Sequence, residues 1–325
     1  MPLKYFFRIA CLLSTALCAA PTCAEELGVH FKTTPRPELL RPFADPIDLS
    51  LLVTGADGKP VKQGSVTLRL DAPAPGRFFS TDFPLVEGTL LNEMRLPLRQ
   101  GKADWKYLFP IRGSYRLVVD VDADGGRKAS KVFDITVRED RTKWLALGVF
   151  SAALFVFGFW AGRIFTGARS PAIALIITGA LSGSAGASPA QSVEATALEI
   201  EAASVGKPAL VRWRSAEENG AQSLQTLLSL TITHVEKEKL VFAIDKVPLS
   251  GEWSMKFHFP DGADYRVAGV ASIPGRPPQH SDQIVSVTGV EPPARAMAPA
   301  MAYFVGVIAL GLAAGRWSKR GSLGK

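Results

Sequence analysis

The chain has little of the chemistry that a metal centre or a covalent catalytic site requires. Its three cysteines all lie within the first 23 residues, and its four histidines and five methionines form no cluster. If a leader is removed after Ala24, no cysteine remains, which excludes disulfides, thiolate metal ligands and a cysteine nucleophile. Phosphate-binding loops, dinucleotide fingerprints, serine-hydrolase elbows and zinc-protease motifs are absent from the sequence as well. We therefore predict a chain that is not an enzyme.

Acidic residues are missing beside the apolar segments, and this explains the basic balance of the chain. The formal net charge is +7, yet the two polar blocks, residues 25–143 and 188–298, together carry a net charge of −1. The excess cations therefore flank apolar segments instead of covering a folded surface. This distribution argues against a nucleic-acid partner and indicates membrane topology.

A leader and three apolar segments account for those cations. Residues 1–24 have the pattern of a secretory signal peptide, with an uncleaved anchor as the alternative. Residues 144–162 and 296–315 are uncharged and long enough to span a bilayer core of roughly 30 Å. Residues 171–187 form a weaker apolar run, either a re-entrant or marginal segment or a full span, and it must cross if both polar blocks share one compartment.

The positions of the cations predict the orientation. Arg163 and Arg169 follow the first span and four cations follow the last, whereas Arg141 and Lys143 weaken the bias at the first span. Because cytoplasmic segments are rich in Lys and Arg, the sequence predicts a bacterial inner-membrane protein with both blocks in the periplasm. The expected divisions are a signal peptide (1–24), a first periplasmic β-sandwich (25–142), a transmembrane helix (143–163), a cytoplasmic loop (164–170), a second transmembrane helix (171–187), a second periplasmic β-sandwich (188–294), a third transmembrane helix (296–315) and a cytoplasmic basic tail (316–325).

Both polar blocks have the alternating apolar pattern of β-strands, for example at residues 105–109 and 253–259. The same spacing of phenylalanine, tyrosine and arginine occurs twice, 150 residues apart: Phe109, Tyr115 and Arg116, then Phe259, Tyr265 and Arg266. Short strands separated by turn-forming residues are typical of β-sandwiches. The predicted fold is therefore all-β exported domains with transmembrane α-helices, the domains being two tandem Ig-like β-sandwiches from an internal duplication.

Two short motifs carry a family resemblance. Residues 57–61 (DGKPV) and 64–68 (GSVTL) resemble bacterial Ig-like domains, and residues 113–119 (GSYRLVV) resemble the closing hairpin of YtkA-like and FixH-like domains. Those families are exported or membrane-anchored β-sandwiches, and some are linked to copper or oxidase assembly. The order of sandwich, two helices, sandwich and helix is also similar to the copper-bearing subunit of particulate methane and ammonia monooxygenases. That family's paired metal histidines have no counterpart in this chain.

The histidines leave copper open as an alternative cofactor, although no cofactor is the primary expectation. His258 is interpreted either as a metal ligand, together with His280, or as a surface histidine on a strand. His30 lies six residues after the expected cleavage position. It could bind copper together with the N-terminal amine only if the leader were cleaved at a different position, next to His30.

Two further patterns suggest contacts. Glycines recur four residues apart in each apolar segment, at Gly158 and Gly162, Gly179 and Gly183, and Gly311 and Gly315. Such pairs allow helices to approach closely, so they predict contacts among the helices or with a partner subunit, unless they only reflect the abundance of glycine in membrane helices. Arg116 and Arg266 are expected either to pair with acidic residues across the sheet or to mark a partner surface.

These observations together predict a non-enzymatic interaction or assembly factor for a membrane protein complex. Its expected partners are the membrane and other membrane protein subunits. The alternative is a copper-handling protein, either a chaperone or an accessory subunit of a membrane metalloenzyme.

The predicted orientation can be tested with reporters fused after Lys325. The basic segment before this residue should keep a fused reporter in the cytoplasm, so a cytoplasm-dependent reporter should be active and a periplasm-dependent one inactive. Activity of the periplasmic reporter at this position would refute three spans after signal removal.

Overall fold

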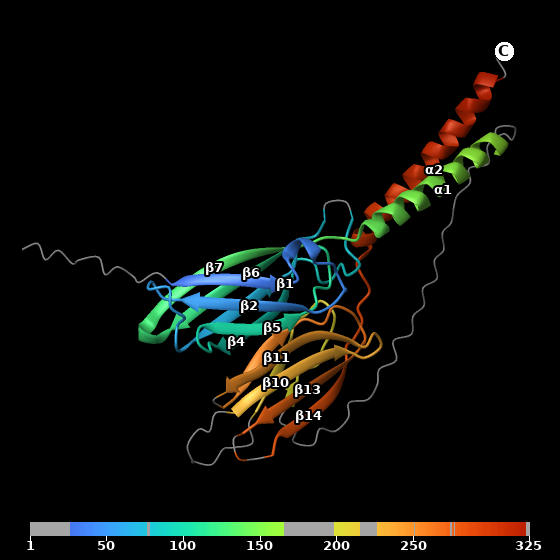
Figure 1. The fold of residues 1–325 in the computed structure, drawn as a ribbon. Coiled ribbons are helices and arrows are strands. Elements are labelled where there is room, and N and C mark those ends of the chain that lie inside the picture. The colour runs from blue at the N-terminus through green and yellow to red at the C-terminus, as the bar shows by residue number, and fades with distance from the viewer. Residues whose placement is uncertain are drawn as a thin grey trace, which may run out of the picture.

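The computed structural model describes residues 27–76, 79–165, 198–214, 226–249, 251–273, 275 and 277–322. Within them, fourteen strands form a body of two seven-stranded antiparallel sheets, and two long helices leave one end of that body (Figure 1). The expected signal peptide and the expected span at 171–187, with Gly179 and Gly183, lie outside the described residues. The prediction of an all-β chain with long apolar helices is confirmed at this level.

Each polar block contributes seven strands. The first block contains β1 (Gly28–Thr34), β2 (Ile47–Thr54), β3 (Gly64–Asp71), β4 (Leu90–Pro97), β5 (Lys102–Tyr107), β6 (Gly113–Ala123) and β7 (Arg127–Val137). The second contains β8 (Leu198–Ile200), β9 (Ala209–Trp213), β10 (Thr226–His234), β11 (Lys239–Leu249), β12 (Trp253–Phe257), β13 (Asp264–Ser272) and β14 (Gln279–Ser286). The helices are α1 (Arg141–Ile164) and α2 (Ala294–Ser322), and short 3-10 turns lie at η1 (Pro37–Leu39) and η2 (Asp124–Gly126).

Neither sheet belongs to one block alone. One sheet has the strand order β1-β2-β5-β11-β10-β13-β14 and the other has the order β7-β6-β3-β4-β12-β9-β8. The blocks therefore meet edge to edge twice, where β5 pairs with β11 and where β4 pairs with β12. We call this double junction the seam. The β body is continuous across the seam, so the blocks are not joined merely by a linker (Figure 1).

The two junctions of the seam have matching registers. Tyr107 pairs with Phe242 at one junction and Phe257 with Asn92 at the other, so a shift of 150 residues in both strands converts one pair into the other. The same shift relates the next backbone hydrogen bonds, in which Leu108 N–H donates to Val241 O and His258 N–H donates to Leu91 O, both at 2.8 Å. The β5–β11 junction and the β4–β12 junction are therefore related to each other by an approximate twofold symmetry.

Alternating side chains explain how the core forms. In β6, every second residue from Tyr115 to Val121 is buried, while Arg116, Asp120 and Asp122 face outward. Aromatic rings continue the core across the seam, with Tyr107 and Phe257 centroids 6.4 Å apart.

The two tyrosines of the sequence repeat fix loops in different ways. The Tyr115 hydroxyl accepts a hydrogen bond from Ile111 N–H at 2.9 Å and donates to Ile111 O, which is a tyrosine corner. In the second block, the Tyr265 hydroxyl instead donates to the Asp261 carboxylate. Both tyrosines are buried, and each holds the loop four residues before it against the end of the sheet.

Both helices are long and apolar enough to cross a membrane. The Asp140 carboxylate accepts a hydrogen bond from Thr142 N–H and caps the start of α1. Helix α1 begins at Arg141 and α2 at Ala294, each two residues before the expected spans. Helix α2 continues through Ser322, so most of the expected basic tail is helical, because no glycine or proline stop follows Gly315 until Gly321.

The glycine pairs lie where α1 and α2 pack together. A methyl group added at Gly158 would lie 2.5 Å from the Ile308 carbonyl oxygen, and one added at Gly311 would lie 3.0 Å from Phe159 N. Gly162 and Gly315 have equally close backbone neighbours on the opposite helix. The Tyr303 hydroxyl adds a hydrogen bond to Ser151 Oγ at 3.1 Å. Backbone contact of this kind is possible only where side chains are absent.

Replacing Gly158 with leucine is expected to force the helices apart, because the new side chain meets the Ile308 carbonyl. The expected cost is about 1–3 kcal/mol, as for other overpacked contacts. Gly148→Leu is the matched control, since nothing lies within 4 Å of a side chain added there. Thermal unfolding of the full chain in mild detergent measures both variants. Equal melting temperatures for the two would contradict a stabilising glycine contact.

Candidate functional site

The structure does not bring the three candidate metal ligands together. His30 lies on β1 and His280 on β14, which are the opposite edges of one seven-stranded sheet. At about 4.8 Å per strand, those edges are roughly 29 Å apart. Within the described residues, no group of three or more His, Cys, Asp or Glu side chains could hold a metal ion. The geometry gives a shared copper site no support.

His258 is a buried component of the seam. It lies directly after β12 and is 1 % exposed, so its interpretation as a surface histidine is wrong. Its Nε2 accepts a hydrogen bond from Gly206 N–H at 3.0 Å, and its Nδ1 lies 2.9 Å from Thr89 Oγ1 and 3.3 Å from Leu90 O. The ring therefore joins the second block to the loop before β4 of the first.

These contacts require the neutral imidazole. An Nε2 atom that accepts from Gly206 N–H carries no proton, so the proton lies on Nδ1, where it faces the Thr89 hydroxyl and the Leu90 carbonyl. Burial lowers the pKa of His258, and the hydrogen bond to Leu90 opposes this only in part. Both ring nitrogens are already used within the protein.

A second polar cluster, which no pattern in the sequence predicted, ties the blocks together near His234. The Asp261 carboxylate accepts hydrogen bonds from Tyr265 and from Lys237 Nζ at 2.7 Å, and His234 Nε2 lies 3.4 Å away. Burial raises the pKa of Asp261, but the hydrogen bonds from Lys237 and Tyr265 outweigh it and the pKa lies below its ordinary value. Lys237 also lies 4.4 Å from the ring centroid of Phe43 in the first block.

The two arginines of the repeat lie on different sheets and do not form one surface. Arg266 on β13 pairs with Asp282 on β14 at 3.8 Å. Arg116 on β6 is flanked in register by Asp71 on β3 and Asp134 on β7. Both positions fit the expected acidic neighbours across the sheet.

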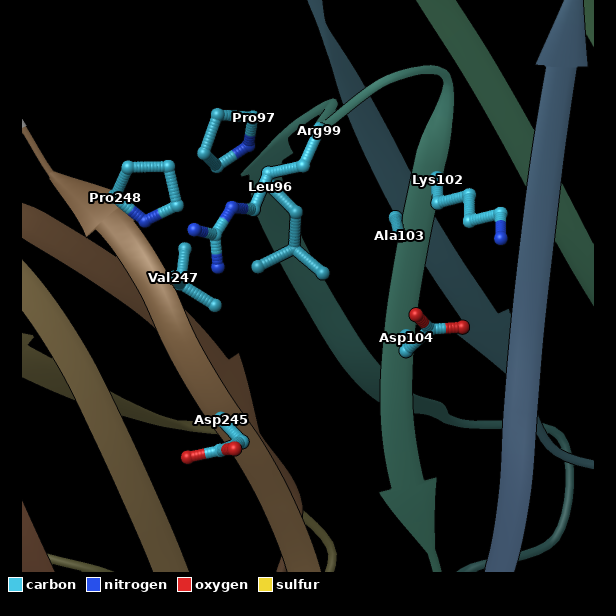
Figure 2. Close-up of a pocket in the computed structure, with 9 residues that line it drawn as sticks. All are labelled: Leu96, Pro97, Arg99, Lys102, Ala103, Asp104, Asp245, Val247 and Pro248. Carbon is cyan, nitrogen blue, oxygen red and sulfur yellow. The ribbon is translucent and has the colours of Figure 1, made fainter. Parts of the chain in front are cut away.

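A groove opens on the seam where β5 and β11 separate. These strands pair only through Tyr107–Phe242 and Lys106–Ala243, and then diverge. Figure 2 shows the groove between them, with the Arg99 side chain directed across it toward β11. Its volume is about 240 Å³, and its lining comes from both blocks: Leu96, Pro97, Arg99, Lys102, Ala103, Asp104, Asp245, Val247 and Pro248.

The groove exists because the approximate twofold relation is broken at one residue. At the other junction, Trp253 Nε1 donates a hydrogen bond to Arg95 O at 3.0 Å and its ring is buried in the seam. The shift of 150 residues places Ala103 where Trp253 stands and Asp245 where Arg95 stands. A methyl group therefore replaces an indole, and the space left is the groove.

The groove walls present both charge signs and are held in place. Asp104 accepts a hydrogen bond from Ser50, and Asp245 accepts one from Ser229 Oγ at 2.7 Å. Arg99 Nη1 donates to Lys246 O at 2.8 Å and so crosses the seam. The arrangement suits a side chain with an apolar body and a polar tip. The only signal in the sequence is the size difference between Ala103 and Trp253 in the two repeats.

Comparisons with known proteins give no family for this chain. No protein-family model matches it, and no curated protein matches it. Similar solved structures include red sea bream transglutaminase (10% identity, covering 81% of this chain and 31% of that one, TM-score 0.21). The α2-macroglobulin of E. coli (14%, 81% and 14%, 0.25) and dimeric latent PorU of Porphyromonas gingivalis (12%, 82% and 25%, 0.26) are further examples. The chain spans less than a third of each, and scores this low carry no argument.

Acid is expected to weaken the folded state through His258. An unfolded histidine is charged below its ordinary pKa of 6.5, whereas burial keeps the folded pKa lower. The stabilising contribution of the neutral ring is therefore present above pH 6.5 and is lost as the pH falls below it toward the folded pKa. Wild-type stability should fall more steeply between about pH 7 and about pH 5 than that of His258→Gln.

Unfolding of the full chain in detergent at each pH measures this difference. His280→Gln is the control, because His280 is exposed on an edge strand and its replacement should leave the wild-type slope. Equal slopes for the wild type and His258→Gln would show that the buried ring does not sense pH.

Proposed function

We propose that this chain is a bacterial inner-membrane protein that serves as a non-enzymatic interaction or assembly factor for a membrane protein complex. Its β body lies in the periplasm in this proposal, and its helices hold it beside other membrane subunits. The observation that carries the proposal is the seam groove: a preformed recess, lined by both blocks, on a body that ends in two apolar helices.

A rigid β body supports an interaction role. Backbone hydrogen bonds cross the seam at both junctions, and His258, Lys239 and Arg99 add side-chain hydrogen bonds between the blocks. A surface that is fixed before binding loses little freedom on association, which favours affinity. The body therefore presents the groove in one geometry.

We also infer that the two blocks are Ig-like sandwiches that arose by duplication and are similar to YtkA-like and FixH-like domains. The tyrosine corner at Tyr115 supports the Ig-like assignment, and the matching seam registers support duplication. A duplicated unit would place equivalent edges at the seam, and selection would then be free to alter one of the two junctions.

The occupant that best fits the groove is an aromatic side chain of a partner subunit, because Trp253 fills the equivalent space at the other junction. A buried aromatic anchor commonly dominates an interface. Filling the groove from within, at the buried Ala103, should therefore block the partner, and thermal unfolding of the variant checks that the chain still folds.

Ala103→Trp tests this directly. The full chain, purified from its native membranes in mild detergent, should bring down stoichiometric membrane subunits, and Ala103→Trp should reduce them roughly tenfold, as expected for loss of a modest hot spot. Ala56→Trp is the control, since Ala56 lies in an exposed turn. Purification of the wild-type chain without any stoichiometric subunit would contradict an assembly role. Stoichiometric copper that disappears in His258→Ala would instead favour the copper-handling alternative.

A further inference from the structure

A hollow of about 780 Å³ lies where the β body meets α1, away from the seam groove. Its walls come from the loop before β4, the start of β6 and the junction between β7 and α1. The side chains that matter for its chemistry are Phe79, Thr81, Arg112, Arg138, Arg141 and Trp144.

A network of ion pairs fixes one wall of this hollow. Arg112 donates to the Glu139 carboxylate at 3.0 Å and lies 5.5 Å from the centroid of Trp144. Lys143 joins the same carboxylate at 3.2 Å and Asp82 at 2.7 Å. Glu139 and Asp82 are therefore already neutralised by cations of the network.

Two more cations line the hollow and take no part in that network. Arg138 and Arg141 are exposed, and neither has an ion pair within the described part of the chain. The Thr81 hydroxyl, also in the wall, is buried and has no hydrogen-bond partner among the described residues. Two guanidinium groups and a hydroxyl donor are the groups that bind a phosphate.

The rest of the hollow is apolar and continues onto the helices. Phe79 meets the ring of Tyr303 on α2 edge-on, with centroids 5.5 Å apart. Trp144, in the first turn of α1, is 51 % exposed. A tryptophan ring at the start of a spanning helix lies at the level of the lipid headgroups. The anion that fits here is therefore one that carries an apolar tail.

We propose that this hollow binds the phosphate group of an anionic phospholipid, with Arg138 and Arg141 as its cationic contacts and Thr81 as a hydroxyl donor. The inference rests on the membrane anchoring of the proposed function, but it concerns a lipid and not a partner subunit. The ion pairs of Arg112 and Lys143 hold the hollow open, and its apolar wall covers the glycerol end of the acyl chains.

Native mass spectrometry of the purified full chain tests the proposal. Micelles are supplied with either phosphatidylglycerol or phosphatidylcholine, and the lipid molecules retained per chain are counted. The wild type should retain phosphatidylglycerol in preference, and Arg138→Gln/Arg141→Gln should lower that retention roughly tenfold. Thr81→Val should lower it less, because it removes one neutral donor. Lys59→Gln/Lys128→Gln removes the same formal charge from two exposed positions, one in the loop after β2 and one in β7, and should behave as wild type.

The proposal is overturned if both lipids are retained equally, or if the double arginine variant retains phosphatidylglycerol as the wild type does. It is also overturned if millimolar inorganic phosphate displaces the lipid, because the site would then be one for free phosphate. Circular dichroism of each variant checks that the substitutions leave the fold intact. Lipid retention by a chain that purifies without partner subunits would uphold this site while the assembly role fails.

Discussion

The hydrogen-bonded seam is the constraint on which the rest of this structure depends. Helix α1 follows the last strand of the first block and α2 follows the last strand of the second, so the two helices meet only if the blocks have one fixed relation. Backbone pairing at both junctions supplies that relation, and the glycine contact between α1 and α2 then closes the arrangement at the end of the body from which the helices leave (Figure 1).

The two blocks differ most in their chemistry at a few positions where residues 150 apart are not alike, and these positions break the approximate twofold relation. His258 stands where Leu108 stands in the first block, and it exchanges a purely apolar contact for hydrogen bonds to Thr89 and Gly206. Asp261 replaces Ile111 under Tyr265 and gathers Lys237 and His234. Ala103 replaces Trp253 and leaves the groove. Two of these changes bind the blocks together and the third opens a surface, as expected if one junction is kept structural while the other gains a function.

Ion pairs change what the cations at the start of α1 indicate about the orientation of the chain in a membrane. Arg141 and Lys143 lie on the side that the proposed orientation places in the periplasm, against the usual bias. Lys143 is neutralised by Asp82 and Glu139, so it opposes that orientation less than its formal charge suggests. Arg141 faces the hollow, where an anionic lipid would neutralise it. The sequence shows only the charges, because Asp82 comes from a loop some 60 residues earlier.

Local pattern was enough to predict the β character of both blocks, the apolar helices and the 150-residue repeat, because alternation and uninterrupted apolar length are properties of neighbouring residues. The same local information placed Gly158 and Gly311 on helix faces but did not show that they face each other. It also left His258 as a surface residue or a ligand, since its partners at Thr89 and Gly206 are far away in the sequence. Edge-to-edge pairing of the blocks, and with it the groove and the placement of both helices at one end, was decided only by tertiary structure. An edge strand carries no mark in its sequence of which other edge it will meet, because backbone hydrogen bonds are alike in every strand.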